Sequence, residues 1–264
     1  MRKIKDWLFD TFLDLMNRHY GQINHDIARD KNVKIFVIMH KPVELPNCFA
    51  DKRLYIPFQA GSAKNPRISG ALQDDVGDNI SQLNINLNEM TGIYWIGRHY
   101  EEVLSPEYVG FMHYRRFLEW DPNMLESGIV FASSYLFHLP VLRYFKRTGG
   151  SVIDAFNVFL AKFKAEACFA ENLDIDRYST QHLTYCCNMF ITDKNTFMRY
   201  HRFICQCIEL CVKLIRDKAV DVSGPRFEDK RCFGFVLEFM TGYWIWHEEK
   251  LGRIRVRRAC KRMY

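Results

Sequence analysis

The apolar segment Val33–Met39 sets the strongest constraint on what this chain can fold into. It is short and rich in β-branched residues, and polar residues with Pro42 follow it at once, which is typical of a buried strand that ends in a turn. Similar segments occur near 54–58, 108–112, 129–132 and 185–191, and helical patterns occur near 79–98, 151–167, 194–216 and 230–249. Strands that alternate with helices predict a layered α/β domain with a mainly parallel central sheet, whose ligands bind beyond the carboxyl ends of the strands.

The length of 264 residues suits one large α/β domain with a sizeable core, because 48% of the residues are hydrophobic and 26% are charged. We expect three parts: an amphipathic helical preface over 1–30, the main domain over 31–249 and a basic tail over 250–264. The nine cysteines have no zinc-like spacing, and we expect them to be reduced residues that fill the core.

The two ends of the chain suggest contact with a membrane surface rather than a membrane span. No signal peptide opens the sequence, and the most hydrophobic window, 233–246, is shorter than the roughly 20 residues that a membrane-spanning helix needs. The preface has one apolar helical side, and the tail carries seven Lys or Arg residues and no acid. We therefore expect a cytoplasmic protein, peripheral on the inner face of the cell membrane, whose termini contact the anionic surface. Two alternatives stay open: the tail is merely solvated, and the preface packs on the main domain or on a partner.

Two basic clusters come directly after predicted strands. His40 and Lys41 follow the first strand, where they could contact a base, a ribose or a phosphate, or simply form a surface turn. The segment His113-Tyr114-Arg115-Arg116 follows the strand over 108–112. Adjacent arginines are costly to hold together unless an anion offsets their charge, and guanidinium groups bind phosphate oxygens bidentately. A diphosphate is the expected ligand, unless each arginine pairs with a local acid such as Glu119 or Asp121.

An acidic turn precedes the helical pattern that starts near residue 79. Its acids are Asp74, Asp75 and Asp78, and Asn79 follows as a candidate helix cap. Carboxylates at this density could bind a hard cation, accept hydrogen bonds from a sugar or base, or stabilise the positive end of the helix. The sequence has no glycine-rich phosphate loop and no nucleophile elbow, which argues against dinucleotide enzymes, P-loop kinases and α/β-hydrolases.

Several segments in order resemble a known family, the domain of unknown function found in bacterial capsular and exopolysaccharide glycosyltransferases. The segments are K-I-F-V-I-M-H-K from Lys34, I-P-F-Q-A-G from Ile56, D-V-G-D-N-I-S from Asp75 with Asn84, E-M-T-G-I-Y-W from Glu89, Y-V-G-F-M-H-Y-R-R-F from Tyr108, N-M-F-I from Asn188 and R-C-F-G-F-V-L-E from Arg231. The resemblance covers about 33–246, and its most specific part is D-x-G-D-N-I-S combined with H-Y-R-R. It departs from the family pattern at Gly97-Arg98-His99 and over 119–176.

The resemblance implies a GT-A-like (Rossmann-like) single domain that transfers a hexose from a UDP-sugar, with galactose the expected sugar. The implied acceptor is a lipid-linked or growing glycan in the synthesis of bacterial capsule, exopolysaccharide or O-antigen. Because the departures fall where acceptor contacts often lie, the identity of the acceptor stays open.

Within this resemblance, residues can be given roles as a hypothesis. Many GT-A enzymes hold a divalent metal with an Asp-x-Asp sequence at the position that His113–Arg116 takes here. We therefore expect Arg115 and Arg116, with Lys41, to stabilise the departing diphosphate, and no metal to be required. The acidic turn keeps a version assisted by Mn²⁺ or Mg²⁺ open. The expected donor-binding residues are His40, Lys41, Asp75, Asp78, Asn79, Arg115 and Arg116.

The base that accepts the proton of the acceptor hydroxyl is expected to be Glu238, because burial in an apolar helix raises the pKa of a carboxyl group. Pairing with Arg231 or Lys230 is the structural alternative for this residue. His113, His182 and Asp78 are alternative bases.

Two other functions compete with transfer. A nucleotide-sugar hydrolase would use the acidic turn with a metal, and a non-catalytic scaffold of a polysaccharide assembly complex would bind no nucleotide. A nucleic-acid partner is not expected, because no binding motif of a known type accompanies the basic tail.

Overall fold

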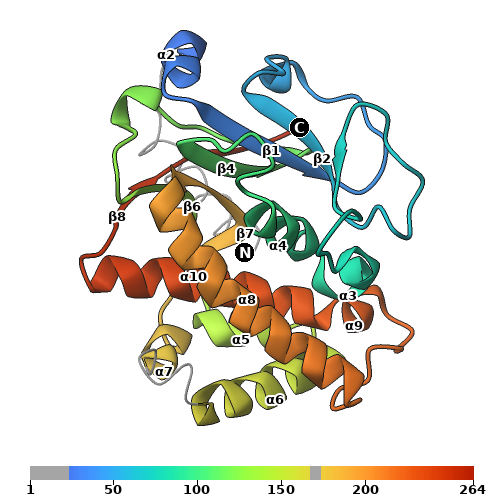
Figure 1. Ribbon diagram of the computed structural model, residues 1–264. Helices are drawn as coiled ribbons and strands as arrows, with labels where there is room; N and C mark the ends of the chain where they lie inside the picture. Colours follow the sequence, from blue (N-terminus) through green and yellow to red (C-terminus); the bar gives the residue numbers. More distant parts are fainter. Residues whose placement is uncertain (1–23, 167–173) are drawn as a thin grey trace.

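A mixed sheet organises the chain, with strands in the order β3-β2-β1-β4-β7-β6-β8. The computed structural model describes residues 24–166 and 174–264, and Figure 1 shows this sheet with helices packed below it. The parallel part consists of β1 (Val33–Met39), β2 (Tyr55–Gln59), β3 (Leu72–Gln73) and β4 (Tyr108–His113). The predicted α/β fold class with a mainly parallel central sheet is confirmed.

The parallel strands are buried on both faces, which explains their continuous apolar sequences. In β1, Val33, Ile35 and Val37 face one core and Phe36 and Ile38 face the other. In the neighbouring strand β4, Gly110 pairs with Ile35. A Cβ at Gly110 would lie only 2.8 Å from the side chain of Ile191, so the space beside the glycine is filled by that side chain.

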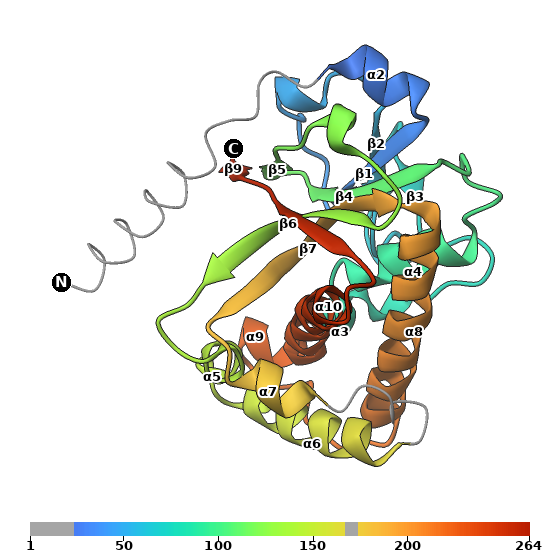
Figure 2. The same cartoon turned by 90° about the vertical axis from the view of Figure 1, so that its left-hand side faces the viewer.

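Two long antiparallel strands extend the sheet beyond β4. These strands are β7 (Leu183–Asp193), which pairs with β4, and β6 (Ile129–Leu136), which pairs with β7. In the view of Figure 2 they reach past the parallel strands toward α5 (Val141–Lys146). Near Ala132 and Ser134 the register between β6 and β7 shifts, so β7 bulges beside the carboxyl end of β4.

Helices cover one face of the sheet. They are α4 (Met90–Arg98), α8 (Lys194–Arg216) and α10 (Cys232–Lys250), with α6 (Ser151–Ala165) packed on the outside of α8 and α10. The carboxylate of Asp193 caps α8 by accepting a hydrogen bond from the N–H of Thr196 at 3.1 Å. The helix α10 is apolar on nearly all sides and is correspondingly buried between β7, α6 and α8.

Shorter elements complete the described chain. The helices are α2 (His25–Asp30), α3 (Asn84–Leu87), α7 (Ile175–Ser179) and α9 (Phe227–Lys230), with 3₁₀ turns at Asn47–Phe49, Ser81–Leu83 and Pro122–Met124. The strands are β5 (Arg116–Leu118), β8 (Arg255–Arg258) and β9 (Lys261–Met263).

The structure differs from the sequence expectations in the helical pattern over 79–98 and in the tail. The helical pattern over 79–98 is divided into a 3₁₀ turn, α3 and α4, because Asn88 adopts a left-handed φ of 56° between the two helices. The basic tail contains β8, which pairs with β6, and β9, which pairs with β5, so both strands belong to the sheet. Most of the predicted preface, residues 1–23, lies outside the described residues.

None of the helices within 24–166 and 174–264 combines the length and apolar character that crossing a membrane requires.

Candidate functional site

The carboxyl ends of β1 and β4 open into a cavity of about 480 Å³, which we call the strand-end cavity. Its wall on the opposite side comes from α3, the start of α4 and the segment that leads into α10. The polar and charged side chains of its lining are His40, Lys64, Asn65, Gln82, Asn84, Asn88, Glu89, His113, Arg115 and Arg231. Its position agrees with the expectation that ligands bind beyond the strand ends of an α/β sheet.

A tight turn between β4 and β5 positions the basic cluster. His113 pairs with Arg116 across the turn, and the Nδ1 atom of His113 accepts a hydrogen bond from the backbone N–H of Arg115 at 3.2 Å. The His113 ring stacks on Tyr114, and the Arg115 guanidinium lies 5.1 Å from the centre of the same Tyr114 ring. These contacts hold the Arg115 side chain at the mouth of the strand-end cavity.

The position of His113 lowers the pKa of its imidazole to about 3. Burial contributes most, followed by the positive charges of Arg116 and Arg115. The ring is therefore neutral at pH 7, and because Nδ1 accepts a hydrogen bond, the proton resides on Nε2. With this pKa, His113 is a poor general base but a suitable hydrogen-bond donor.

A second arginine reaches the strand-end cavity from the start of α10. Arg231 donates from Nε to the side-chain oxygen of Asn88, and its guanidinium lies 4.7 Å from the ring centre of Phe227. Within the described residues, neither Arg115 nor Arg231 forms an ion pair with a carboxylate. Two unneutralised guanidinium groups in one cavity are an arrangement that favours a polyanionic ligand.

His40 belongs to the same electrostatic environment. Its ring meets Tyr114 edge-on at 5.6 Å between centres. Burial, then the charges of Arg231, Lys41 and Arg115, lower the pKa of His40 below its ordinary value. The side chain of Lys41 is exposed and lies outside the lining of the strand-end cavity.

A smaller cavity of about 260 Å³ is lined in part by Cys186 and Cys187 at the bulge in β7, and we call it the aromatic cavity. Its lining comprises Tyr135, Phe137, Tyr144, Phe145 and Phe235 together with Arg116, Arg147, Thr148, Cys186, Cys187, Glu238 and Lys261. Arg115 and Arg116 are adjacent in sequence but line different cavities: Arg115 lines the strand-end cavity and Arg116 the aromatic cavity. Glu119 pairs with Arg262 rather than with either of them.

The bulge in β7 connects the two cavities through two carboxylates. Cys187 and Asn188 both have positive φ values, 73° and 50°. The backbone N–H of Cys187 donates to Glu238 at 2.7 Å, and the side-chain amide of Asn188 donates to Glu89 at 3.1 Å. Glu238 lines the aromatic cavity and Glu89 lines the strand-end cavity, so successive bulge residues bind one carboxylate from each.

This environment raises the pKa of Glu238 to about 7. Burial is the main cause, and the negative charge of Glu89 adds to it, whereas the Cys187 hydrogen bond and the charges of Arg116 and Arg231 oppose the rise. Glu238 forms no ion pair with any described cation, Arg231 and Lys230 included. A carboxyl group that ionises near neutral pH is suited to general base catalysis.

The acidic turn lies outside the lining of both cavities. Asp74 is fully buried and accepts hydrogen bonds from the N–H of Gly61, from the N–H and hydroxyl of Ser62 and from the hydroxyl of Ser81. It therefore fixes the loop that follows β2, and this loop supplies Lys64 and Asn65 to the strand-end cavity.

The remaining predicted residues of the turn are engaged by neighbouring groups. Asp75 pairs with Arg67 at 2.7 Å, and Asp78 accepts hydrogen bonds from Arg98 at 2.6 Å and from the Tyr94 hydroxyl at 3.0 Å. The Arg98 contact, with that of Tyr94, lowers the pKa of Asp78.

Asn79 bonds within its own turn, to the carbonyl of Gly77 and the N–H of Ser81. His182, an alternative base, makes a hydrogen bond from Nδ1 to the carbonyl of Phe137 and lines neither cavity.

The described residues do not fit a divalent metal of the Asp-x-Asp type. The oxygens of Asp74 already accept four hydrogen bonds, and the place of the motif after β4 carries His113–Arg116, whose charge repels a cation. No group of three potential His, Cys, Asp or Glu ligands occurs in the described part of the chain. We derive no catalytic step through a metal.

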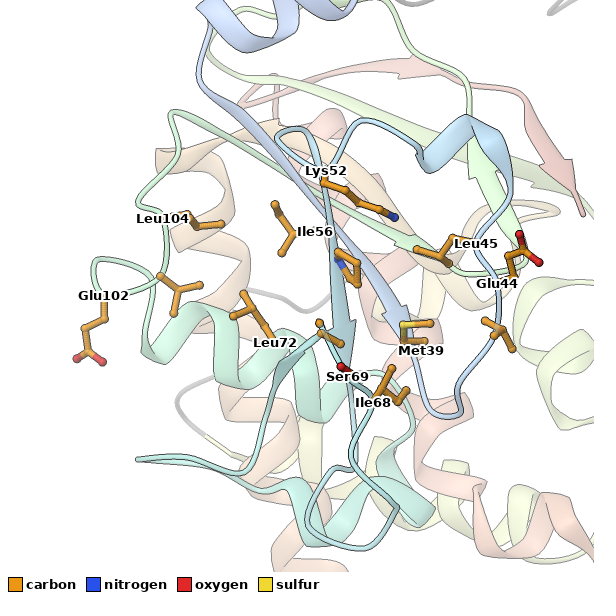
Figure 3. A pocket seen from close by; sticks show the side chains of 15 residues that line it. Met39, Glu44, Leu45, Lys52, Ile56, Ile68, Ser69, Leu72, Glu102 and Leu104 are labelled. Atoms are coloured by element: carbon orange, nitrogen blue, oxygen red, sulfur yellow. The ribbon is translucent and has the colours of Figure 1, made fainter.

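A larger hollow, about 920 Å³, lies elsewhere, along β2 and β3 (Figure 3). Apolar side chains such as Ile56, Leu72 and Leu104 form its wall, with Glu44 and Glu102 near its rim. Lys52 is the one basic residue of its lining, so this hollow offers little to a diphosphate despite its size.

Several site residues were not singled out as ligands from the sequence: Asn88, Glu89, Asn188 and Arg231. Their local patterns carry no motif, because each reaches the site through a helix junction or a strand bulge. Glu89, Asn188 and Arg231 do, however, stand first in three of the segments that resemble the known family, and this shared position was the available signal.

Comparison with known proteins agrees with this architecture. Residues 34–134 and 160–249 match the family model described as Domain of unknown function (DUF4422). None of the curated proteins matches the chain. Among solved structures, the apo structure of the WbbM bifunctional glycosyltransferase is similar, with a TM-score of 0.70 and 22% sequence identity. The match covers 88% of this chain and 45% of that chain, so this chain spans less than half of its structural neighbour, and at this identity the likeness is one of fold.

Proposed function

The chain belongs to the family described as Domain of unknown function (DUF4422), and from this premise we propose that it is a glycosyltransferase that uses a nucleotide-sugar donor. The observation that carries the proposal is the convergence of Arg115 and Arg231, both without a carboxylate partner in the described chain, on the strand-end cavity. The fold shared with a bifunctional glycosyltransferase supports it. A cavity of about 480 Å³ lies in the range typical of small-molecule sites.

In this proposal the nucleotide diphosphate lies between Arg115 and Arg231, with the Nε2–H of His113 as a neutral donor. Fixed positive charge that is already in place stabilises the negative charge that develops on a leaving diphosphate, without a metal ion. Lys64 adds a further positive charge at the same cavity, and His40 lies there as a neutral imidazole because its pKa is lowered. The donor is a UDP-hexose and the sugar is galactose, as the family resemblance suggested.

We assign the role of general base to Glu238. The acceptor hydroxyl gives its proton to the Glu238 carboxylate as its oxygen bonds to the anomeric carbon of the donor sugar. The bond between that carbon and the diphosphate oxygen breaks, and its electron pair leaves with the diphosphate. The pKa of about 7 lets Glu238 accept a proton at neutral pH, whereas His113 at about 3 does not.

The remaining expectations form part of the same proposal. The acceptor is a lipid-linked or growing glycan of a bacterial surface polysaccharide, and the protein acts at the inner face of the cell membrane. The side chains of Asp75, Asp78 and Asn79 have partners of their own and line neither cavity, so we place their expected donor-binding roles second to Arg115 and Arg231.

A thermal-shift titration tests the donor site. UDP, UDP-galactose, GDP and CDP are each added with manganese and with a chelator, because a ligand at 100 times its dissociation constant stabilises the folded state by about 2.7 kcal/mol. We expect UDP compounds to raise the melting temperature with chelator present. The variant Arg115→Gln should weaken UDP binding about tenfold, as loss of a charge-assisted hydrogen bond does.

The matched control is Arg202→Gln, which removes an exposed arginine on α8 that lines neither cavity. A shift seen only with manganese would move the diphosphate to the acidic turn. Binding of none of the four nucleotide compounds would exclude the donor site and favour a scaffold. Release of free galactose from UDP-galactose that stops with chelator would favour a hydrolase.

A further inference from the structure

The aromatic cavity has features of a binding site that the donor does not use. It is lined by Glu238, the proposed base, and by Cys187 of the β7 bulge, whose next residue, Asn188, binds Glu89 of the strand-end cavity. In the direct displacement proposed above, the acceptor hydroxyl reaches the base and the anomeric carbon from the side that faces away from the leaving diphosphate. The acceptor therefore has to occupy space of this kind.

Aromatic rings and positively charged side chains line the cavity. The Phe137 and Tyr144 rings stack at an interplanar angle of 9°, with centres 3.4 Å apart, and the Arg147 guanidinium lies 3.5 Å from the Tyr144 ring centre on the same stack. The Lys261 ammonium lies 4.2 Å from the ring centre of Tyr135. Aromatic faces pack against the C–H groups of a sugar ring, and an arginine and a lysine beside them attract an anion.

Two buried polar atoms of this cavity lack partners within the described part of the chain. They are the Nε of Arg116 and the hydroxyl oxygen of Thr148, and both residues line the cavity. A buried polar group without a hydrogen bond is costly, and its free energy falls when a ligand oxygen reaches it after a small side-chain rotation. Arg116 also forms no ion pair with a described carboxylate, so its positive charge remains available to the cavity.

We propose that the aromatic cavity is the acceptor subsite and that it takes a sugar phosphate, with the sugar ring against Tyr135 and the phosphate near Arg116 and Arg147. The proposal rests on the proposed function, because the cavity can serve as an acceptor site only if Glu238 is the general base. A lipid-linked acceptor and a soluble sugar phosphate share this chemistry, since both carry a phosphate on the first sugar.

The test is calorimetric titration of the whole chain with the 1-phosphates of glucose, galactose and N-acetylglucosamine. Each titration is run without UDP and again with saturating UDP, so that the strand-end cavity is filled. The comparison ligands are the three methyl glycosides, which lack the phosphate, and inorganic phosphate, which lacks the sugar. We expect at least one sugar phosphate to bind the UDP-saturated protein about tenfold more tightly than its methyl glycoside and than inorganic phosphate.

The variants Arg147→Gln and Thr148→Val should each weaken this binding, Arg147→Gln by about tenfold, while the UDP affinity stays unchanged. Arg143→Gln is the matched control, because Arg143 is exposed on the same helix, α5, and does not line the cavity. Arg147 is also exposed, so its replacement leaves the core intact.

Three outcomes would overturn the acceptor subsite: no sugar phosphate binds, inorganic phosphate binds as tightly as every sugar phosphate, or Arg147→Gln binds like the unaltered protein. Failure of the proposed function has a different signature, since UDP itself would then not bind. A lipid-linked source is distinguished from a soluble one by repeating the titration with an undecyl diphosphate-linked form of the sugar that bound. Tighter binding of the undecyl compound identifies the lipid-linked source.

Discussion

The backbone N–H of Cys187 donates a hydrogen bond of 2.7 Å to the carboxylate of Glu238, which ties the middle of α10 to the bulge of β7. The bond fixes the carboxylate at the edge of the aromatic cavity while burial keeps the pKa of Glu238 near 7. The apolar stretch 233–246 of α10 thus presents the Glu238 carboxylate, in a fixed orientation, to the place where the acceptor is proposed to bind.

The first prediction concerns the pH dependence of transfer. Because the base must be ionised, kcat/KM should rise about tenfold between pH 6 and pH 8, through the pKa of about 7 that Glu238 has in the folded protein. The variant Glu238→Gln should lose about 10²–10⁴-fold in kcat and show no rise over this range. Initial-rate measurements across the pH range check both, and a variant that keeps more than a tenth of the activity would assign the base elsewhere.

The second prediction concerns stability at different pH values. The pKa of Glu238 is about 7 in the folded state against 4.5 for an unperturbed glutamate, so between these values the folded protein binds more protons than the unfolded chain. Glu238 therefore costs stability as the pH rises through this window, and the full cost is present above pH 7. Glu238→Gln should raise the free energy of unfolding by about 1–3 kcal/mol at pH 8 and by much less at pH 4.5.

Urea unfolding at the two pH values measures this difference. Glu249→Gln is a control, because Glu249 is exposed at the end of the same helix, where it accepts a hydrogen bond from the Tyr185 hydroxyl. Equal effects of Glu238→Gln at pH 8 and pH 4.5 would show that the carboxyl group titrates normally.

The third prediction tests how Arg231 is held. Gly234 packs against the side-chain amide of Asn88, and an added Cβ would overlap the Nδ2 atom of that amide. Gly234→Ala should therefore displace Asn88, release Arg231 from its hydrogen bond and weaken UDP binding about tenfold. Isothermal titration with UDP is the measurement.

Gly242→Ala is the matched control for this prediction. It makes the same change on α10, where the new Cβ would meet Tyr178 and Thr184 away from the strand-end cavity. We expect this variant to lose stability and keep its UDP affinity, and Asn88→Ala to reproduce the effect of Gly234→Ala. Unchanged UDP binding in both Gly234→Ala and Asn88→Ala would remove Arg231 from the donor site.

The fourth prediction separates structure from function in the acidic turn. Asp74 accepts four hydrogen bonds while fully buried, so Asp74→Ala leaves several donors unsatisfied and should lower the free energy of unfolding by about 3 kcal/mol or more. Asp176→Ala removes an exposed partner of Lys164 and should change it by less than about 1 kcal/mol. Urea unfolding compares the two, and a loss below about 1 kcal/mol for Asp74→Ala would contradict the assigned role.

The sequence predicted best those elements whose burial follows from local pattern. The strand Val33–Met39 and the helix over 194–216 have the predicted bounds, because one is apolar throughout and the other carries a clear apolar face after a capping aspartate. The break at Asn88 could not be read in this way, since a left-handed residue between two helices leaves the helical spacing of the flanking apolar residues intact.

The candidate site likewise contains residues that local pattern predicts and residues that only tertiary contacts bring into it. His113 and Arg115 were predicted because they directly follow a strand, and Glu238 because it interrupts an apolar helix. Arg231 and Glu89 enter the site through tertiary contacts with Asn88 and Asn188, and no single segment of sequence encodes those contacts. The tail shows a similar limit: its charge pattern is that of a solvated end, yet β8 and β9 pair with strands more than 100 residues earlier in the chain.

The bulge of β7 links the two proposed binding sites. Cys187 and Asn188 are consecutive residues, and each holds a carboxylate that lines a different cavity. A nucleotide hydroxyl that donates to Glu89 would compete with the amide of Asn188 for that carboxylate, and one peptide unit joins Asn188 to Cys187, the donor to Glu238. We therefore expect the two proposed substrates to be coupled: each should change the binding affinity for the other, and by thermodynamic reciprocity by the same factor.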